Sequence, residues 1–260
     1  MENTQTAVPM MPRLSGPVDL AKRSWALFKQ QWKTLVLIAV IPTAITLVFS
    51  LAFAGLLAAF PGQLEALLAG AGTVAGNIGL IALAVLLILV FVVISTLATL
   101  ALVYAVKDQS DFKSSFRLAW QNILGFWWVS LVAIAILIPA FIALIIPGII
   151  LGTYYSFSSF IYVDENARGY AALKRSLWYV RDYWWPVFGR IVAMVVAAMA
   201  VSLIPQLIFG LVNLPEAANL INTLVDLVVG PLQLIYFWLI YQELKKVKGQ
   251  PPVAVVEVQN

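Results

Sequence analysis

The sequence predicts an all-α integral membrane protein with six transmembrane helices. Of its 260 residues, 62% are hydrophobic and only 11% are charged, whereas soluble domains carry about 25% charged residues. The mean hydropathy is +0.95, and long apolar runs alternate with short polar connections. All sixteen lysines and arginines also fall on one side of the membrane when six runs cross it, which is the pattern of membrane proteins.

Five apolar runs have the roughly 20 residues that a membrane-spanning helix needs. A sixth run, GIILGTYYSFSSFIYV at 148–163, is short and rich in hydroxyl groups. As a helix it reaches roughly 24 Å, less than the hydrocarbon core of about 30 Å. Pro147-Gly148 before it predicts a tight turn between two helices. The five longer runs lie at about 34–60, 77–106, 126–146, 187–213 and 219–242.

The charges decide whether the sixth run crosses. The loops at 61–76 and 214–218 contain no lysine or arginine. If 148–163 crosses, every cation lies on one side; if it does not, the cluster at 168–190 moves to the opposite side, against the positive-inside rule. We therefore predict six spans in the cell (inner) membrane with both termini cytoplasmic. The predicted organisation is a flexible N-terminus (1–16), one six-span domain (17–246) and a flexible tail (247–260).

A short pattern precedes each pair of spans. Two tryptophans separated by six residues occur three times, and a cation stands three residues before the first tryptophan each time. The chain therefore divides into three repeat units, at about 17–106, 112–163 and 170–242, each an amphipathic interfacial helix followed by a hairpin of two spans. The residues of the pattern are Trp25, Trp32, Trp120, Trp127, Trp178 and Trp185, with Lys22, Arg117 and Arg175.

The third copy shows why an interfacial helix is predicted. On a helical wheel Leu173, Leu177, Val180 and Trp184 form an apolar stripe, while cations gather on the opposite side. Such a helix suits the headgroup plane, with tryptophans at the boundary and cations on anionic headgroups. We expect these residues to be anchors, and the lipid bilayer with its anionic headgroups to be the partner. The alternative is a headgroup-binding pocket formed by Arg175, Arg181 and Arg190.

The segment IPGIILGTYYSFSSFIYVDENARGYAALKRSLWYVRDYWW, which begins at Ile146, resembles the membrane-domain family named after glycerophosphoryl diester phosphodiesterase. That family has a similar order of a Pro-Gly turn, a short hydroxyl-rich span, an acidic Val-Asp-Glu ending and an Ala-Leu-Lys-Arg-Ser helix. The resemblance covers the middle third of the chain and implies a six-span plan. Most members have no assigned activity. In some relatives a soluble phosphodiesterase barrel is attached, but the roughly 18 residues after the last span are too few for one.

The residue types exclude several chemistries. The chain has no cysteine and no histidine, which excludes disulfides, thiol nucleophiles, thiolate or imidazole metal sites and catalytic triads that use imidazole. We expect no enzymatic activity, no cofactor, no metal and no nucleic-acid partner. Adjacent Asp164 and Glu165 lack a third ligand for a divalent cation, so we expect them to neutralise the basic helix that follows.

One acidic residue, Asp226, lies inside a predicted span, where a charge is costly and marks a functional hypothesis. Gln206 and Asn222 lie at a similar depth and complete a candidate polar site. Gly148, Gly152 and Ser156 form a stripe of small residues that predicts close helix packing; the alternative is a polar cavity lined by hydroxyl groups of the same span. We predict a non-catalytic protein that organises or scaffolds the membrane. The alternative is a small permease with its site around Asp226 and the fourth span.

Overall fold

The computed structural model describes residues 14–59, 62, 74–211, 214–249 and 251. Most of both predicted flexible termini lies outside these residues. Across the described residues the chain folds into helices and forms no strand. Six helical stretches among them are long and apolar enough to cross a membrane. The prediction of an all-α, multi-pass membrane protein is therefore confirmed.

The described helices occur in a simple order along the chain. They are α1 (Pro17–Ala59), α3 (Val74–Asp108), α4 (Phe112–Ala143), α5 (Ile145–Tyr155), α6 (Ser158–Glu165), α7 (Tyr170–Val180), the 3-10 turn η1 (Arg181–Tyr183), α8 (Trp184–Leu211) and α9 (Pro215–Lys248).

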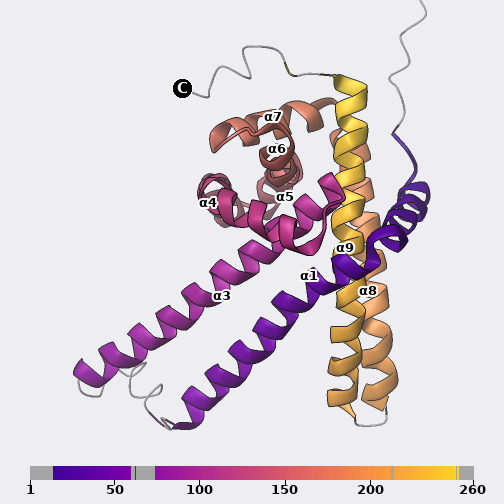
Figure 1. Ribbon diagram of the computed structural model, residues 1–260. Coiled ribbons are helices and arrows are strands. Elements are labelled where there is room, and N and C mark those ends of the chain that lie inside the picture. The colour runs from indigo at the N-terminus through magenta and orange to yellow at the C-terminus, as the bar shows by residue number, and fades with distance from the viewer. Residues whose placement is uncertain (1–13, 60–61, 63–73, 212–213, 250, 252–260) are drawn as a thin grey trace, which may run out of the picture.

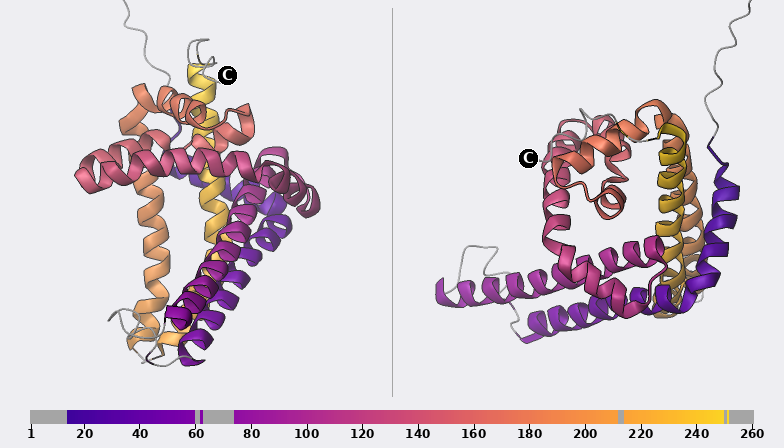
Figure 2. Two further views of the ribbon diagram at one scale, coloured as in Figure 1. Left: turned by 90° about the vertical axis from the view of Figure 1, so that its left-hand side faces the viewer. Right: turned by 45° about the horizontal axis from the view of Figure 1, so that its top comes forward.

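Three pairs of apolar helices leave a common polar region in different directions (Figures 1 and 2). The parts of the pairs α1/α3, α4/α5 and α8/α9 that lie outside this region are called the arms. The α1/α3 arm slants away from α8/α9, and α4 points in a third direction. The common region, which we call the head, comprises residues 14–39, 97–129, 151–191 and 234–249.

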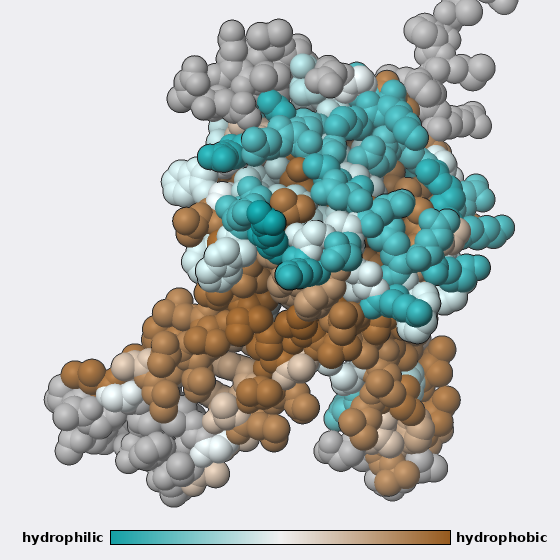
Figure 3. Space-filling view, in the orientation of Figure 1, coloured by the Kyte–Doolittle hydropathy of each residue, from teal (hydrophilic) through white to brown (hydrophobic). Residues whose placement is uncertain are grey.

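The head and the arms differ sharply in polarity (Figure 3). Every lysine and arginine that the structure describes lies in the head, and the arms are almost wholly apolar. Among the described residues, every buried hydrophobic side chain except Ala218 also belongs to the head. The hydrophobic core of this protein is therefore in the head.

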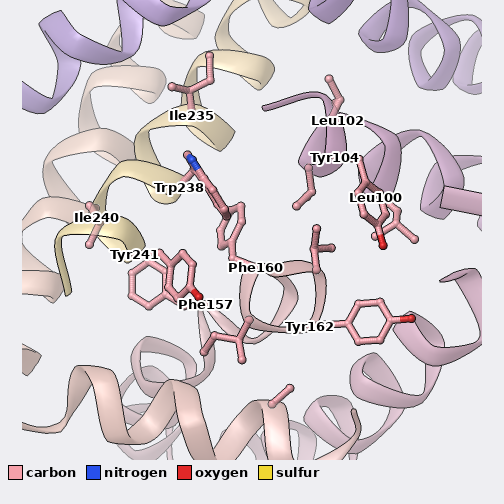
Figure 4. Close-up of a cluster of buried hydrophobic side chains, with 14 of the residues drawn as sticks. Leu100, Leu102, Tyr104, Phe157, Phe160, Tyr162, Ile235, Trp238, Ile240 and Tyr241 are labelled. Atoms are coloured by element: carbon pink, nitrogen blue, oxygen red, sulfur yellow. The ribbon is translucent and has the colours of Figure 1, made fainter. Parts of the chain in front are cut away.

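The short helix α6 is the centre of that core. Its residues Phe160 and Tyr162 are buried, and Phe160 stacks against Tyr241 of α9 with 6.3 Å between ring centroids. Figure 4 shows side chains from α3, α6 and α9 converging around α6. Tyr162 reaches α4, where its hydroxyl donates a hydrogen bond to the Asn122 carbonyl at 2.7 Å. The core thus ties three arms together at one end.

The helix breaks occur at positions that the sequence did not mark clearly. α1 bends at Gln31, whose backbone is non-helical (φ −126°, ψ 17°). The turn expected at Pro147-Gly148 is instead at Leu144, which is extended (φ −162°, ψ 139°). Pro147 lies in the first turn of α5, where a missing N–H is tolerated. The run at 148–163 is divided between α5 and α6.

Candidate functional site

A cluster of charged and tyrosine side chains joins α6, α7 and α9 inside the head. It begins where α6 ends at Glu165, because Asn166 adopts the left-handed conformation (φ 52°) that closes a helix. Gly169, also at positive φ (52°), precedes the first residue of α7. A Cβ atom at Gly169 would meet the Trp128 indole, so only glycine fits there. This turn places the acidic end of α6 beside the basic face of α7.

We define the ionic cluster as six residues held by short contacts. Arg175 donates to Glu165 at 3.0 Å, and the Tyr179 hydroxyl donates to the same carboxylate at 2.7 Å. The Tyr241 hydroxyl lies 2.8 Å from both Asp164 and Glu165, and its single proton is shared between them. Lys245 pairs with Asp164 at 2.5 Å. The members are Asp164, Glu165, Arg175, Tyr179, Tyr241 and Lys245.

The chemistry of the ionic cluster is that of a structural clamp. Its two carboxylates are matched by two cations, and the side chains of Arg175 and Glu165 are only 8% and 9% exposed. No group of three or more acidic, cysteine or histidine residues suited to a metal occurs in the described part of the chain. A buried pair of this kind is strongly destabilising to break, because it leaves an uncompensated charge.

The sequence predicted one of the two ion pairs in this cluster. Glu165 does pair with the basic helix that follows it, through Arg175. Asp164 instead pairs with Lys245 of α9, far along the chain. The roles of Tyr179 and Tyr241 were not predicted, and the one available signal was the presence of polar aromatic residues at apolar positions of two helices.

A second set of contacts fastens the N-terminal end of α1 to the α8/α9 pair. The Arg190 guanidinium donates from Nη2 to the Leu14 carbonyl at 2.8 Å, and to the Ser15 carbonyl from Nη2 at 2.6 Å and from Nε at 2.8 Å. The Glu243 carboxylate accepts from the Ser15 N–H at 3.0 Å and pairs with Arg23 at 2.5 Å. Arg190 thus binds backbone carbonyls of the protein itself.

These positions rule out the alternative headgroup pocket as it was predicted. Arg175 is 7% exposed and belongs to the ionic cluster. Arg190 binds the N-terminal segment, while Arg181 is exposed on η1. The three guanidinium groups therefore serve three separate places. The anchor role expected for Arg175 is likewise corrected, because its side chain points into the protein.

The other predicted anchors differ in exposure. Four of the six tryptophans are well exposed: Trp25 (47%), Trp32 (51%), Trp120 (66%) and Trp185 (74%). Lys22 and Arg117 are exposed as well. Trp127 and Trp178 are partly buried and pack against the core.

The apolar face of α7 also faces protein rather than lipid. Leu173 and Val180 are fully buried, and α7 contacts α5, α6 and α9. The amphipathic pattern of this helix is therefore used to build the head.

Asp226 faces an open groove of about 500 Å³ between α1 and α9. The groove is lined by residues 40–50 of α1 and 220–227 of α9, where these two helices diverge from each other in Figure 1. Apolar side chains alternate along it with four hydroxyl groups. The lining residues are Val40, Thr43, Ala44, Thr46, Leu47, Ser50, Leu220, Thr223, Asp226 and Leu227.

Of the two residues expected beside Asp226, Asn222 lies one turn before it on α9, and Gln206 lies on α8. Gln206 of α8 is exposed, and it does not line the described groove. Asn222 is half-buried, and its side-chain oxygen is buried without a hydrogen-bond partner. The fourth-span hydroxyls lie elsewhere: those of Thr153 and Ser158 donate to carbonyls of Ile149 and Tyr155. The structure thus places Asp226 in a groove of α1 and α9 that neither Gln206 nor the fourth-span hydroxyls line.

The stripe of small residues is only partly a packing surface. Gly148 is buried against the Phe141 ring of α4, which leaves no space for a Cβ atom. Gly152 has no atom within 4 Å of the position that a Cβ would occupy. Ser156 donates its hydroxyl to the Thr153 carbonyl at 2.7 Å. Close approach of α4 and α5 therefore depends on Gly148 alone among these three.

Comparison with known proteins adds no assignment: no family model, no curated protein and no solved structure matches the chain.

Proposed function

We propose that the protein is a non-catalytic component of the cell (inner) membrane that organises the cytoplasmic leaflet around its head. The observation that carries the proposal is the head itself, a well-packed body held together by the ionic cluster. Its exposed tryptophans and cations, which we call the rim, are Trp25, Trp32, Trp120, Trp185, Lys22 and Arg117. Tryptophan prefers the membrane–water boundary, and surface cations attract anionic headgroups. The positive-inside rule supports a cytoplasmic location for the head and both termini.

The arms support this proposal through what they lack. Among the described residues, they contain no cluster of titratable groups like that of the head. The ionic cluster is charge-balanced and mostly enclosed, so it offers no free acid or base to a substrate. A head that gathers anionic lipid, held by arms in the bilayer, is what these features favour. The resemblance to the phosphodiesterase-associated membrane domains agrees with a membrane role without catalysis.

Energy transfer from the rim tryptophans to dansyl-labelled lipid tests the proposal. The full-length protein is reconstituted in nanodiscs with either dansyl-phosphatidylserine or dansyl-phosphatidylcholine at the same trace level. We expect stronger transfer to phosphatidylserine, and a fall in that preference as salt rises, because exposed charges are screened beyond about 8 Å at physiological ionic strength.

Substitutions of exposed cations provide the matched comparison. Lys22→Gln combined with Arg117→Gln removes two exposed charges of the rim and should reduce the preference. Each cation near an anionic surface contributes about 1 kcal/mol. Lys107→Gln is the control, because this lysine is partly buried and donates to the Val163 carbonyl. Equal transfer to the two lipids would refute the proposal.

A second function, that of a small carrier, is favoured by one specific observation. Asp226 is exposed in a groove of the membrane-embedded arms, and intramembrane carboxylates commonly mark transport sites. Flux measurements in liposomes with wild type and Asp226→Asn test it. Solute or ion uptake that the substitution abolishes would replace the organising role with transport, whereas no uptake in either protein excludes carriage of the solutes tested.

A further inference from the structure

The groove between α1 and α9 contains the one charged side chain that the structure describes in the arms. Asp226 is exposed in it, while all described lysines and arginines lie in the head. Counted along α9, Asp226 stands eleven residues after Pro215, which is about 16 Å. For an arm that enters a hydrocarbon core of about 30 Å at Pro215, this distance puts the carboxylate near the middle of the bilayer.

The hydroxyl groups around Asp226 present only acceptor atoms to the groove. Each donates its proton to the carbonyl four residues earlier in its own helix, at distances between 2.8 and 3.0 Å. A hydroxyl that has donated its proton retains its lone pairs for accepting. The carboxylate is also an acceptor when ionised. The hydroxyl residues are Thr43, Thr46, Ser50 and Thr223.

This set of acceptors selects a cationic donor. A primary ammonium carries three N–H donors and one positive charge, which matches one carboxylate with neighbouring hydroxyl oxygens. Ca²⁺ needs six to eight oxygen ligands and Mg²⁺ near-ideal octahedral geometry, which a single carboxylate with scattered hydroxyls does not supply. A charge-assisted hydrogen bond is also about twice as strong as a neutral one.

The remainder of the groove selects an apolar body. Its other lining residues are aliphatic, including Leu47, Leu220 and Leu227, and the groove is open along the side of the arms. Lipid chains surround the arms at this depth, so a ligand reaches the site through the bilayer. An alkyl chain covers the aliphatic wall while its ammonium group neutralises Asp226.

We propose that this groove binds an amphiphile that carries a primary ammonium group on an alkyl chain, with Asp226 as its counter-ion. The two remaining N–H groups donate to hydroxyl oxygens among Thr43, Thr46 and Thr223. The inference concerns binding only, and it requires neither the leaflet-organising role nor transport.

Photolabelling of the full-length protein in nonionic maltoside micelles tests the proposal. The probe is a dodecylamine with a diazirine on its chain, and the labelled peptides are located by mass spectrometry. We expect saturable labelling within 40–50 and 220–227, and displacement by unlabelled dodecylammonium. Asp226→Asn should weaken this displacement at least about tenfold, the loss that corresponds to about 1.4 kcal/mol.

Three comparisons separate the contribution of the ammonium group to binding from that of the alkyl chain and from that of a positive charge alone. Dodecanol should displace the probe weakly, and equally in wild type and Asp226→Asn. Tetramethylammonium and sodium should displace it weakly because they lack the chain. Thr46→Val, which keeps the size of the side chain and removes its acceptor oxygen, should weaken displacement by dodecylammonium by roughly threefold, within the range of one neutral hydrogen bond.

Asp19→Asn is the matched control. Asp19 is an exposed carboxylate of α1, which also lines the groove, but it lies in the head. It should leave displacement unchanged. Labelling confined to other segments, displacement by dodecanol as strong as by dodecylammonium, or an unaltered response in Asp226→Asn would each overturn the proposal. Displacement by sodium or tetramethylammonium at equal concentration would overturn the requirement for an amphiphile.

Discussion

The arms are the more apolar part of the molecule, yet the hydrophobic core of the described residues lies in the head. In the α8 stretch, 6% of the most apolar window is buried, and in the α3 stretch 11% is, whereas most of α6 is buried. The hydrophobic effect acts only where water is the alternative surrounding. Lipid chains are as apolar as leucine, so helices in the bilayer gain little by covering one another. Burial in this protein therefore marks where water reaches the chain.

The largest loss of stability is expected when the ionic cluster of the head is broken. Glu165→Gln leaves Arg175 buried without its counter-charge, and it weakens the hydrogen bonds that Tyr179 and Tyr241 donate to this side chain, because an amide oxygen carries no negative charge. We expect a loss of about 3–5 kcal/mol in the free energy of unfolding, the range for breaking a buried pair. Thermal unfolding in micelles, followed by tryptophan fluorescence, measures the change.

A double substitution separates the buried charge from the lost packing. Glu165→Gln with Arg175→Gln removes both charges, and it should recover part of the stability because no uncompensated ion remains. A double variant less stable than the sum of the two single variants would contradict the description of the ionic cluster as a charge-balanced clamp.

Two leucines of the same helix compare head and arm directly. Leu100 of α3 is fully buried in the head, and Leu89 of α3 is 53% exposed in the arm. Leu100→Ala should destabilise the protein by about 2–5 kcal/mol, because it leaves a cavity. Leu89→Ala should change stability by less than about 0.5 kcal/mol, as is usual for exposed sites, because lipid fills the space. Similar losses in the two variants would show that the arms are packed like the head.

The class of this protein was predictable because the bilayer imposes a simple rule on sequence. A helix must satisfy its own backbone and present some 20 apolar residues, so the spans followed from counting. The helix breaks were harder. Gln31 and Leu144 carry no breaker signal, whereas Pro147, which does, is accommodated in the first turn of α5.

The polar sites were predictable only as far as their pairing is local. Glu165 and Arg175 lie ten residues apart, and their pairing followed from the order of charges. Lys245 and Tyr241 come from another helix, so their contacts with Asp164 depend on how α6 and α9 pack. Depth alone grouped Gln206 with Asp226, but a depth does not say which face of a helix a side chain occupies. The helical wheel of α7 likewise identified the correct apolar face. It could not show whether protein or lipid covers that face.

Effects smaller than that of Leu100→Ala are expected at two glycines one turn apart on α5, within the α4/α5 arm and at its junction with the head. A Cβ atom at Gly148 would collide with the Phe141 ring, and that ring is 47% exposed. Because the ring has room to swing toward lipid, Gly148→Ala should cost about 1 kcal/mol, the low end for overpacking. Gly152→Ala meets no atom within 4 Å and should stabilise α5 by up to about 1 kcal/mol through helix propensity. Thermal unfolding of both variants measures the difference. The size of the Gly148→Ala loss is decisive. If it equalled the loss in Leu100→Ala, the Phe141 ring would be held as rigidly as a core residue. The α4/α5 arm would then be packed like the head, against the difference between head and arms described above.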